Sequence, residues 1–80
     1  MNGEEETVEH EYLIVSSITY ALKSKSLLEA RGIAASVEKI KNVKALGGCG
    51  YGVRVRSVMA DAAAKILAAN GIHVVQRDSG

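Results

Sequence analysis

Two similar halves make up the sequence, and this internal repeat limits the folds that the chain can adopt. The segment Leu27 to Ile33 (LLEARGI) resembles the segment Ile66 to Ile72 (ILAANGI), which lies 39 positions later. Within each half, a run with strand-like spacing precedes a stretch with helical spacing, and a second strand-like run follows. The repeat therefore predicts a βαβ unit that occurs twice.

Serine and glycine mark the ends of the two predicted helices. Ser16 or Ser17 offers an N-cap hydroxyl to the first helix, and Gly32 ends it, because a residue without a Cβ accepts the left-handed conformation. By the same reasoning the second helix starts from a cap at Ser57 and ends at Gly71. The predicted strands cover residues 12–15, 34–40, 51–56 and 72–77.

This order of elements predicts an α+β fold of the ferredoxin-like type, βαββαβ, with a four-stranded antiparallel sheet and both helices on one face. Residues 1–10 are polar and rich in glutamate, so we expect a flexible acidic tail before a single domain over residues 11–78. We expect Leu13 and Val15 to lie on the sheet face away from the helices. Such an apolar open face offers a contact surface for a homodimer or another partner.

Composition excludes several classes of function. One cysteine cannot form an internal disulfide, and no apolar run approaches the length of a membrane span, so we expect a cytoplasmic protein without membrane contact. His10, Cys49 and His73 are isolated, which argues against a metal, and no cofactor motif is present. A sheet that binds RNA needs exposed aromatic residues, and the chain has no Phe or Trp, so no nucleic acid is expected.

Cys49 is the strongest candidate for a chemically reactive residue in this sequence. It lies in the run GGCGYG (residues 47–52), which we expect to connect the second and third strands near the start of the first helix. The partial positive charge of a helix N-terminus, together with amides freed by Gly47, Gly48 and Gly50, would favour the nucleophilic thiolate. Lys44 adds positive charge nearby. The alternative is that Cys49 is a small buried residue in an inert turn.

The sequence also resembles a known family. The run Tyr12–Ser17 (YLIVSS), the Gly32-Ile33 pair and the Cys49-Gly50 pair leading into 52–55 (GVRV) are similar to the selenium/sulfur carrier protein-like family, over about residues 12–75. The resemblance implies that Cys49 carries sulfur or selenium as a persulfide or selenosulfide. Two departures concern donor specificity: the residues before the cysteine are glycine rather than serine, and 41–46 lacks a proline.

The predicted function is a small thiol carrier, not a turnover enzyme, that receives sulfane sulfur or selenium on Cys49 from a donor protein and hands it to an acceptor protein. Besides Cys49, the predicted site includes six residues that surround the thiol in the sequence or lie at the start of the first helix: Gly47, Gly48, Gly50, Lys44, Ser16 and Ser17. The alternative is a small-ligand-binding module resembling the ACT type, or a dimeric interaction module, with contacts through Leu13, Val15 and Val75. In that case Cys49 has no chemical role.

Overall fold

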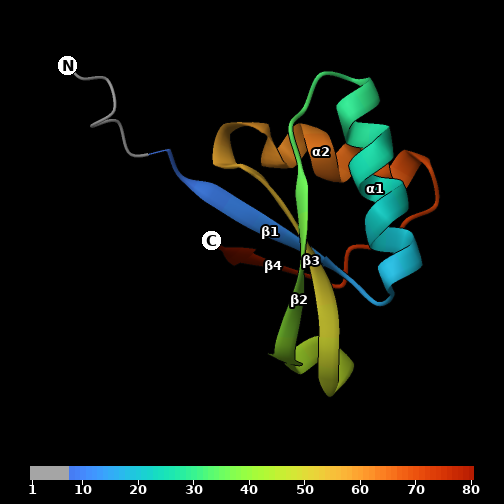
Figure 1. The fold of residues 1–80 in the computed structure, drawn as a ribbon, viewed down its shortest axis with the longest axis vertical. Coiled ribbons are helices and arrows are strands. Elements are labelled where there is room, and N and C mark those ends of the chain that lie inside the picture. The colour runs from blue at the N-terminus through green and yellow to red at the C-terminus, as the bar shows by residue number, and fades with distance from the viewer. Residues whose placement is uncertain (1–7) are drawn as a thin grey trace.

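The computed structural model describes residues 8–80 (Figure 1). The elements are β1 (His10–Val15), α1 (Ile18–Ala30), β2 (Ser36–Val43), the 3-10 helix η2 (Lys44–Leu46), β3 (Gly48–Arg56), α2 (Ser57–Ala69) and β4 (Gln76–Ser79). Most of the predicted acidic tail, residues 1–7, lies outside the described residues. His10 already belongs to β1, so the ordered elements begin one residue before the predicted domain boundary.

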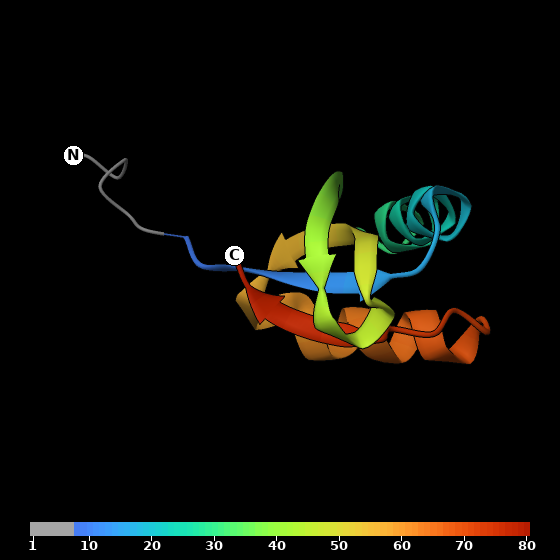
Figure 2. The ribbon, with the colours of Figure 1, turned by 90° about the horizontal axis from the view of Figure 1, so that it is seen from below.

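The sheet has the strand order β2-β3-β1-β4, and each pair of neighbouring strands is antiparallel. Together with the order β-α-β-β-α-β, this confirms the predicted ferredoxin-like α+β fold. Figure 2 shows the C-terminal end of β4 beside the start of β1, where the Gly80 N–H donates to the His10 carbonyl (2.8 Å). No helix in residues 8–80 is long and apolar enough to cross a membrane.

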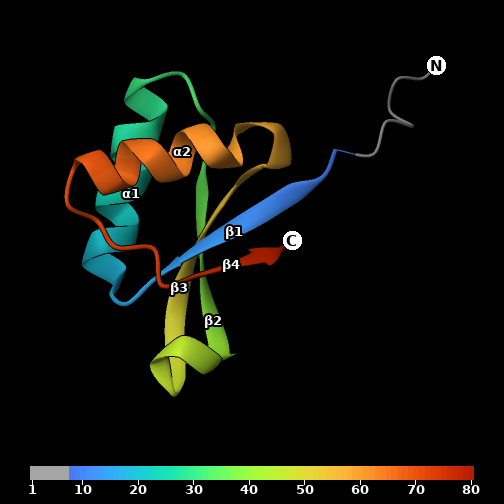
Figure 3. The same cartoon turned by 180° about the vertical axis from the view of Figure 1, so that it is seen from behind.

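The main hydrophobic core lies between the sheet and the two helices. The helices contact each other, and Figure 3 shows α2 crossing α1. Val53 and Val55 alternate on β3 with Gly52 and Arg54, so the valines contact the helices while the glycine and arginine lie on the opposite face. We call these the helix face and the open face. Small residues on the inner side of α2, Ala60 and Ala63 among them, are fully buried and allow the helix close to the sheet.

The prediction for β1 is wrong: Leu13 and Val15 lie on the helix face, not on the open face. Both are fully buried members of the main core. The register explains the placement, because Leu13 pairs with Val53, and directly opposed residues of an antiparallel pair share one face. The expected dimer or effector contact through these two side chains therefore has no exposed surface to use.

A second apolar cluster covers part of the open face. Ile14 is fully buried although it lies opposite the main core, and Val43 is 1% exposed. After β2, the short η2 helix places Leu46 near Ile14, since a Cβ at Gly50 would meet atoms of both side chains. The Ala45 N–H donates to the Gln76 side-chain oxygen (3.3 Å), which ties η2 to β4 across this face.

The helix ends follow the sequence signals with one exception. Ser17 is the N-cap of α1, where its hydroxyl oxygen accepts from the Tyr20 N–H (3.2 Å), and Gly32 and Gly71 both adopt positive φ after the helices. Ser57 is not a cap. It is the first residue of α2, and its N–H donates to the Glu9 carbonyl (2.9 Å), so the backbone before β1 satisfies this orphan amide.

The last strand starts later than predicted. Residues 72–75 lead from α2 toward the sheet, and only Gln76–Ser79 form β4. Ile72 is buried in the main core, and the Val75 N–H donates to the Ile14 carbonyl (2.8 Å) just before the strand begins.

Candidate functional site

Cys49 is an exposed, free thiol in a strand. Sequence reasoning expected it in a loop, but β3 already begins at Gly48. The pairing of β1 with β3 ends at Val15 and Tyr51, so the segment from Gly48 to Gly50 has β2 as its neighbour and extends past β1. Figure 1 shows this β2–β3 hairpin reaching one end of the molecule, away from α2.

The thiol lies at the end of the sheet where α1 begins. Tyr51 is opposite Val15, the last residue of β1, and Cys49 is two residues further along β3 in the direction of Ser16 and Ser17. Alternation along the strand puts the side chains of Cys49 and Tyr51 on the helix face. Ser17 uses its hydroxyl oxygen to cap α1, while Ser16 is exposed beside it.

The neighbouring strand bulges opposite Cys49. Ile40 pairs with Gly50 and Val43 with Gly48, so two residues of β2, Lys41 and Asn42, face the single residue between those glycines. Asn42 has φ of 59°, in the left-handed region that asparagine adopts more readily than most residues. Bulges bend and twist a strand, and here the bulge shapes the hairpin at the thiol.

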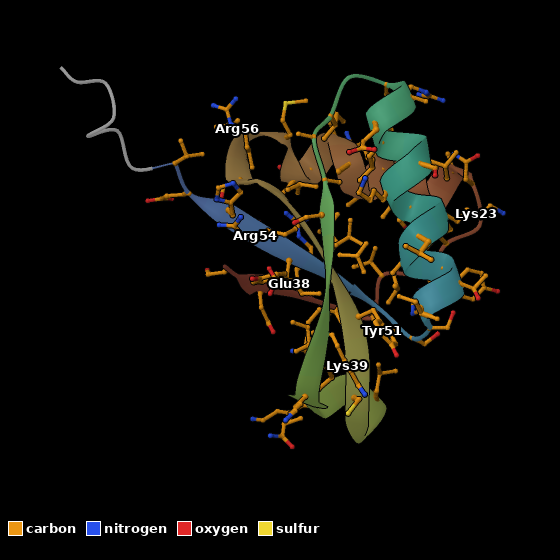
Figure 4. The ribbon with its side chains drawn as sticks, viewed as in Figure 1. Lys23, Glu38, Lys39, Tyr51, Arg54 and Arg56 are labelled. Carbon is orange, nitrogen blue, oxygen red and sulfur yellow. The ribbon has the colours of Figure 1, made fainter. Side chains whose placement is uncertain are left out.

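Positive charge surrounds this end of the hairpin. Lys39 lies opposite Tyr51 on β2, and Figure 4 shows both residues toward the lower end of the hairpin. Lys41 and Lys44 are exposed on the same segment, and no salt bridge within residues 8–80 involves any of the three lysines. Cys49 takes part in no side-chain hydrogen bond among those residues either.

The glycines around Cys49 differ in their roles. Gly47 has φ of 66° and closes the turn after η2, with its N–H donating to the Lys44 carbonyl (3.2 Å). Gly48, Gly50 and Gly52 belong to β3, where amides two residues apart point to the same side but lie about 6.6 Å apart, so they do not converge on one atom. The amide cluster expected from the sequence is therefore absent from this extended segment.

Packing explains two of these glycines. A Cβ at Gly50 would stand 2.7 Å from Leu46 Cδ1 and 3.2 Å from the Val15 carbonyl oxygen, and one at Gly52 would stand 2.8 Å from Tyr12 Cδ1. By contrast, a Cβ at Gly48 would meet nothing within 4 Å. Gly50 and Gly52 thus make room for the side chains on the open face, whereas Gly48 has open space around it.

Polar side chains occupy the rest of the open face. The Tyr12 hydroxyl donates to Glu38 (3.0 Å), and burial together with this hydrogen bond raises the pKa of Tyr12 above its ordinary value. On β4, the Gln76 amide donates to both carboxylate oxygens of Asp78 (3.2 and 2.9 Å). Beyond the cluster around Ile14, the open face is therefore polar and is not the apolar surface predicted from Leu13 and Val15.

On the edge of the sheet, Arg77 joins two elements. Its guanidinium forms ion pairs with Glu11 of β1 and with Asp61 of α2. The hydrogen bonds to Glu11 and to Asp61 raise the pKa of Arg77 above its ordinary value. Asp61 of α2 is thereby tied to the edge strand β4.

Two depressions accompany these features. The larger, about 650 Å³, is open and lies between α2 and the chain leading into β4, lined by Ala64, Ala68 and residues 71–77. The smaller, about 260 Å³, is lined by His10, residues 34–36, Arg54 and Arg56. Neither includes Cys49. Across residues 8–80 no cluster of three or more His, Cys, Asp or Glu side chains is suited to hold a metal ion.

No protein-family model, curated protein or solved structure matches the chain. The resemblance to the selenium/sulfur carrier protein-like family therefore stays a prediction from the residues around Cys49. The fold and the geometry of the hairpin are the grounds on which a function can be argued.

Proposed function

We propose that this protein is a small thiol carrier, in which Cys49 accepts sulfane sulfur or selenium from a donor protein and delivers it to an acceptor protein. The observation that carries the proposal is the exposure of Cys49 on a hairpin that extends past the neighbouring strand. A carrier must present its sulfur to two different partner sites, and a thiol on a projecting hairpin can enter both without rearrangement of the domain.

The proposed transfer needs no oxidant or reductant. The Cys49 thiolate attacks the terminal sulfur of a donor persulfide, the sulfur–sulfur bond of the donor breaks, and its electron pair leaves with the donor thiolate. The product is a persulfide on Cys49. The acceptor repeats the same exchange in the second step, and a terminal selenium would follow the same course.

The surrounding residues support this chemistry through charge and access. Lys39 and Lys41 lie across the hairpin from the segment that carries Cys49, and their positive charge would stabilise a persulfide anion held there. The Cys49 side chain is exposed, so a partner can reach the thiol. Uncompensated lysines on a projecting hairpin also favour a partner with an acidic surface around its sulfur.

Transfer is tested by incubating the protein with a persulfide-loaded cysteine desulfurase and measuring the intact mass. We expect a gain of one sulfur atom that is removed by a reductant and is absent from Cys49→Ser. A matched control carries the thiol elsewhere: in Cys49→Ser/Ser26→Cys, the cysteine is at an exposed position of α1. Loading of this control at the rate of the natural chain would refute a site-specific carrier and leave only a generic exposed thiol.

A small-ligand-binding module is the second candidate, and the depression of about 650 Å³ beside α2 favours it. Its contacts would involve Ala68 and Val75 instead of the buried Leu13 and Val15. Free amino acids, tested one by one, should then raise the thermal midpoint of the natural chain and of Cys49→Ser equally. Ala68→Trp should abolish that shift, whereas Ala62→Trp, on the same helix outside the depression, should keep it.

A further inference from the structure

We propose that the smaller depression on the open face is a binding site for a phosphate group. We call it the basic notch and define it by the residues that line it: His10, Ala34, Ala35, Ser36, Arg54 and Arg56. Its volume is about 260 Å³, which is sufficient for a phosphate group but small for a larger ligand that must be enclosed completely.

The strand register brings the polar residues of the notch together from three strands. Arg54 and Arg56 are two residues apart on β3 and therefore lie on one face. His10 of β1 is opposite Arg56, and Ser36 of β2 is opposite Arg54. Figure 4 shows both arginines toward the end of β3 that is remote from Lys39 and Tyr51.

A hydrogen bond orients one of the guanidinium groups. Arg54 Nη2 lies 3.0 Å from His10 Nδ1, and because an arginine side chain is always protonated, its N–H donates and the ring nitrogen accepts. In the neutral ring the proton is then on Nε2, which is a further donor. The notch thus collects donors from Arg54, Arg56, His10 and the Ser36 hydroxyl.

The two arginines of the notch have no ion-pair partner among the described residues. Neither Arg54 nor Arg56 forms an ion pair with a carboxylate in residues 8–80, whereas Arg77 has two carboxylate partners. Glu38, on the same face, accepts the hydroxyl of Tyr12. A phosphate monoester carries about −1.5 to −2 charges at pH 7, whereas a carboxylate carries a single negative charge. Two guanidinium groups therefore match a phosphate better than a carboxylate.

The basic notch is independent of the proposed carrier site. Cys49 lies at the other end of β3, and its side chain is on the opposite face of the sheet from Arg54 and Arg56. Failure of the carrier proposal would therefore leave the phosphate site unaffected, and the reverse also holds.

Titration with inorganic phosphate, at constant ionic strength maintained with chloride, tests the proposal by NMR of the ¹⁵N-labelled chain. We expect saturable shifts of the amides of residues 10, 34–36 and 54–56. Arg56→Gln, at an exposed position, should lower the affinity for phosphate at least about tenfold, because one charge-assisted contact is lost. Arg54→Gln should lower the affinity for phosphate by as much, and Cys49→Ser should bind phosphate as tightly as the natural chain does.

The control variant is Arg31→Gln, which removes an exposed arginine at the end of α1, outside the notch. It should bind phosphate with unchanged affinity. Shifts that do not saturate, or that are equal in Arg56→Gln and Arg31→Gln, would overturn the proposal. Acetate that binds as tightly as phosphate would also overturn it, because the assignment rests on the match between two cations and a dianion.

Discussion

Leu46 lies directly over Gly50: a Cβ built on this glycine would be 2.7 Å from Leu46 Cδ1. The contact joins η2 to β3 and helps to bury Ile14 on the open face. The glycine-rich run next to the only cysteine is therefore in part a packing device. Its chemical interest rests on the position of Cys49, on the opposite face of the same strand.

Gly50→Ala should lower the free energy of unfolding by about 1–3 kcal/mol, because the added methyl group overpacks the contact with Leu46 and approaches the backbone of Val15. Urea denaturation measures the change. Gly48→Ala is the matched control, since it has open space around it, and it should leave stability unchanged or raise it by up to about 1 kcal/mol. Equal destabilisation by both substitutions would contradict the packing role.

Leu13→Ala should lower the free energy of unfolding by about 2–5 kcal/mol, because it opens a cavity where the side chain is fully buried between the sheet and the helices. Leu22→Ala, at a position on α1 that is 52% exposed, should change stability by less than about 0.5 kcal/mol. Sedimentation should be measured beside denaturation. A Leu13→Ala chain of unchanged stability that dissociates from a dimer would instead assign Leu13 to an interface.

Tyr12 should make the stability fall at alkaline pH. Its folded-state pKa is raised by burial and by the bond to Glu38, so above about pH 10 the unfolded chain loses this proton while the folded chain retains it. The contribution is complete below the unfolded-state value and is lost as pH rises toward the folded-state value. Urea midpoints at pH 8 and pH 10.5 should therefore differ less for Tyr12→Phe than for the natural chain.

Tyr20→Phe is the control for that comparison. Tyr20 is 46% exposed, and its hydroxyl has no hydrogen bond within residues 8–80. Its removal should leave the alkaline loss of stability as it is. If Tyr12→Phe and the natural chain lose stability in parallel, burial and the bond to Glu38 do not raise the pKa of Tyr12 on folding.

The local signals in the sequence were sufficient for the order of the elements. Ser17 caps α1, and Gly32 and Gly71 end the helices, because these depend on the backbone preferences of single residues. The third strand could also be assigned to its faces, since Val53 and Val55 alternate with glycine and arginine. The repeated βαβ pattern then left the ferredoxin-like sheet as the simplest closure.

The basic notch illustrates a signal that sequence reasoning saw only in part. The spacing of Arg54 and Arg56 is visible in the sequence and puts both on one face of a strand, but His10 looked isolated because its partner is 44 positions away. Only the pairing of β1 with β3 brings the ring to the guanidinium groups. A search for charged residues of equal parity on strands expected to pair would have found the cluster.

By itself, the sequence determined the succession of helices and strands, the ends of both helices at glycine, and the presence of one thiol in a glycine-rich run. Tertiary structure alone decided which residues of β1 face the helices. Residues 12–15 are apolar on both sides of the strand, so the sequence does not distinguish the two faces, and the pairing of Leu13 with Val53 assigns them. It also decided that Gly50 makes room for Leu46 and that Cys49 is exposed. These outcomes depend on contacts between distant segments, which local residue preferences do not encode.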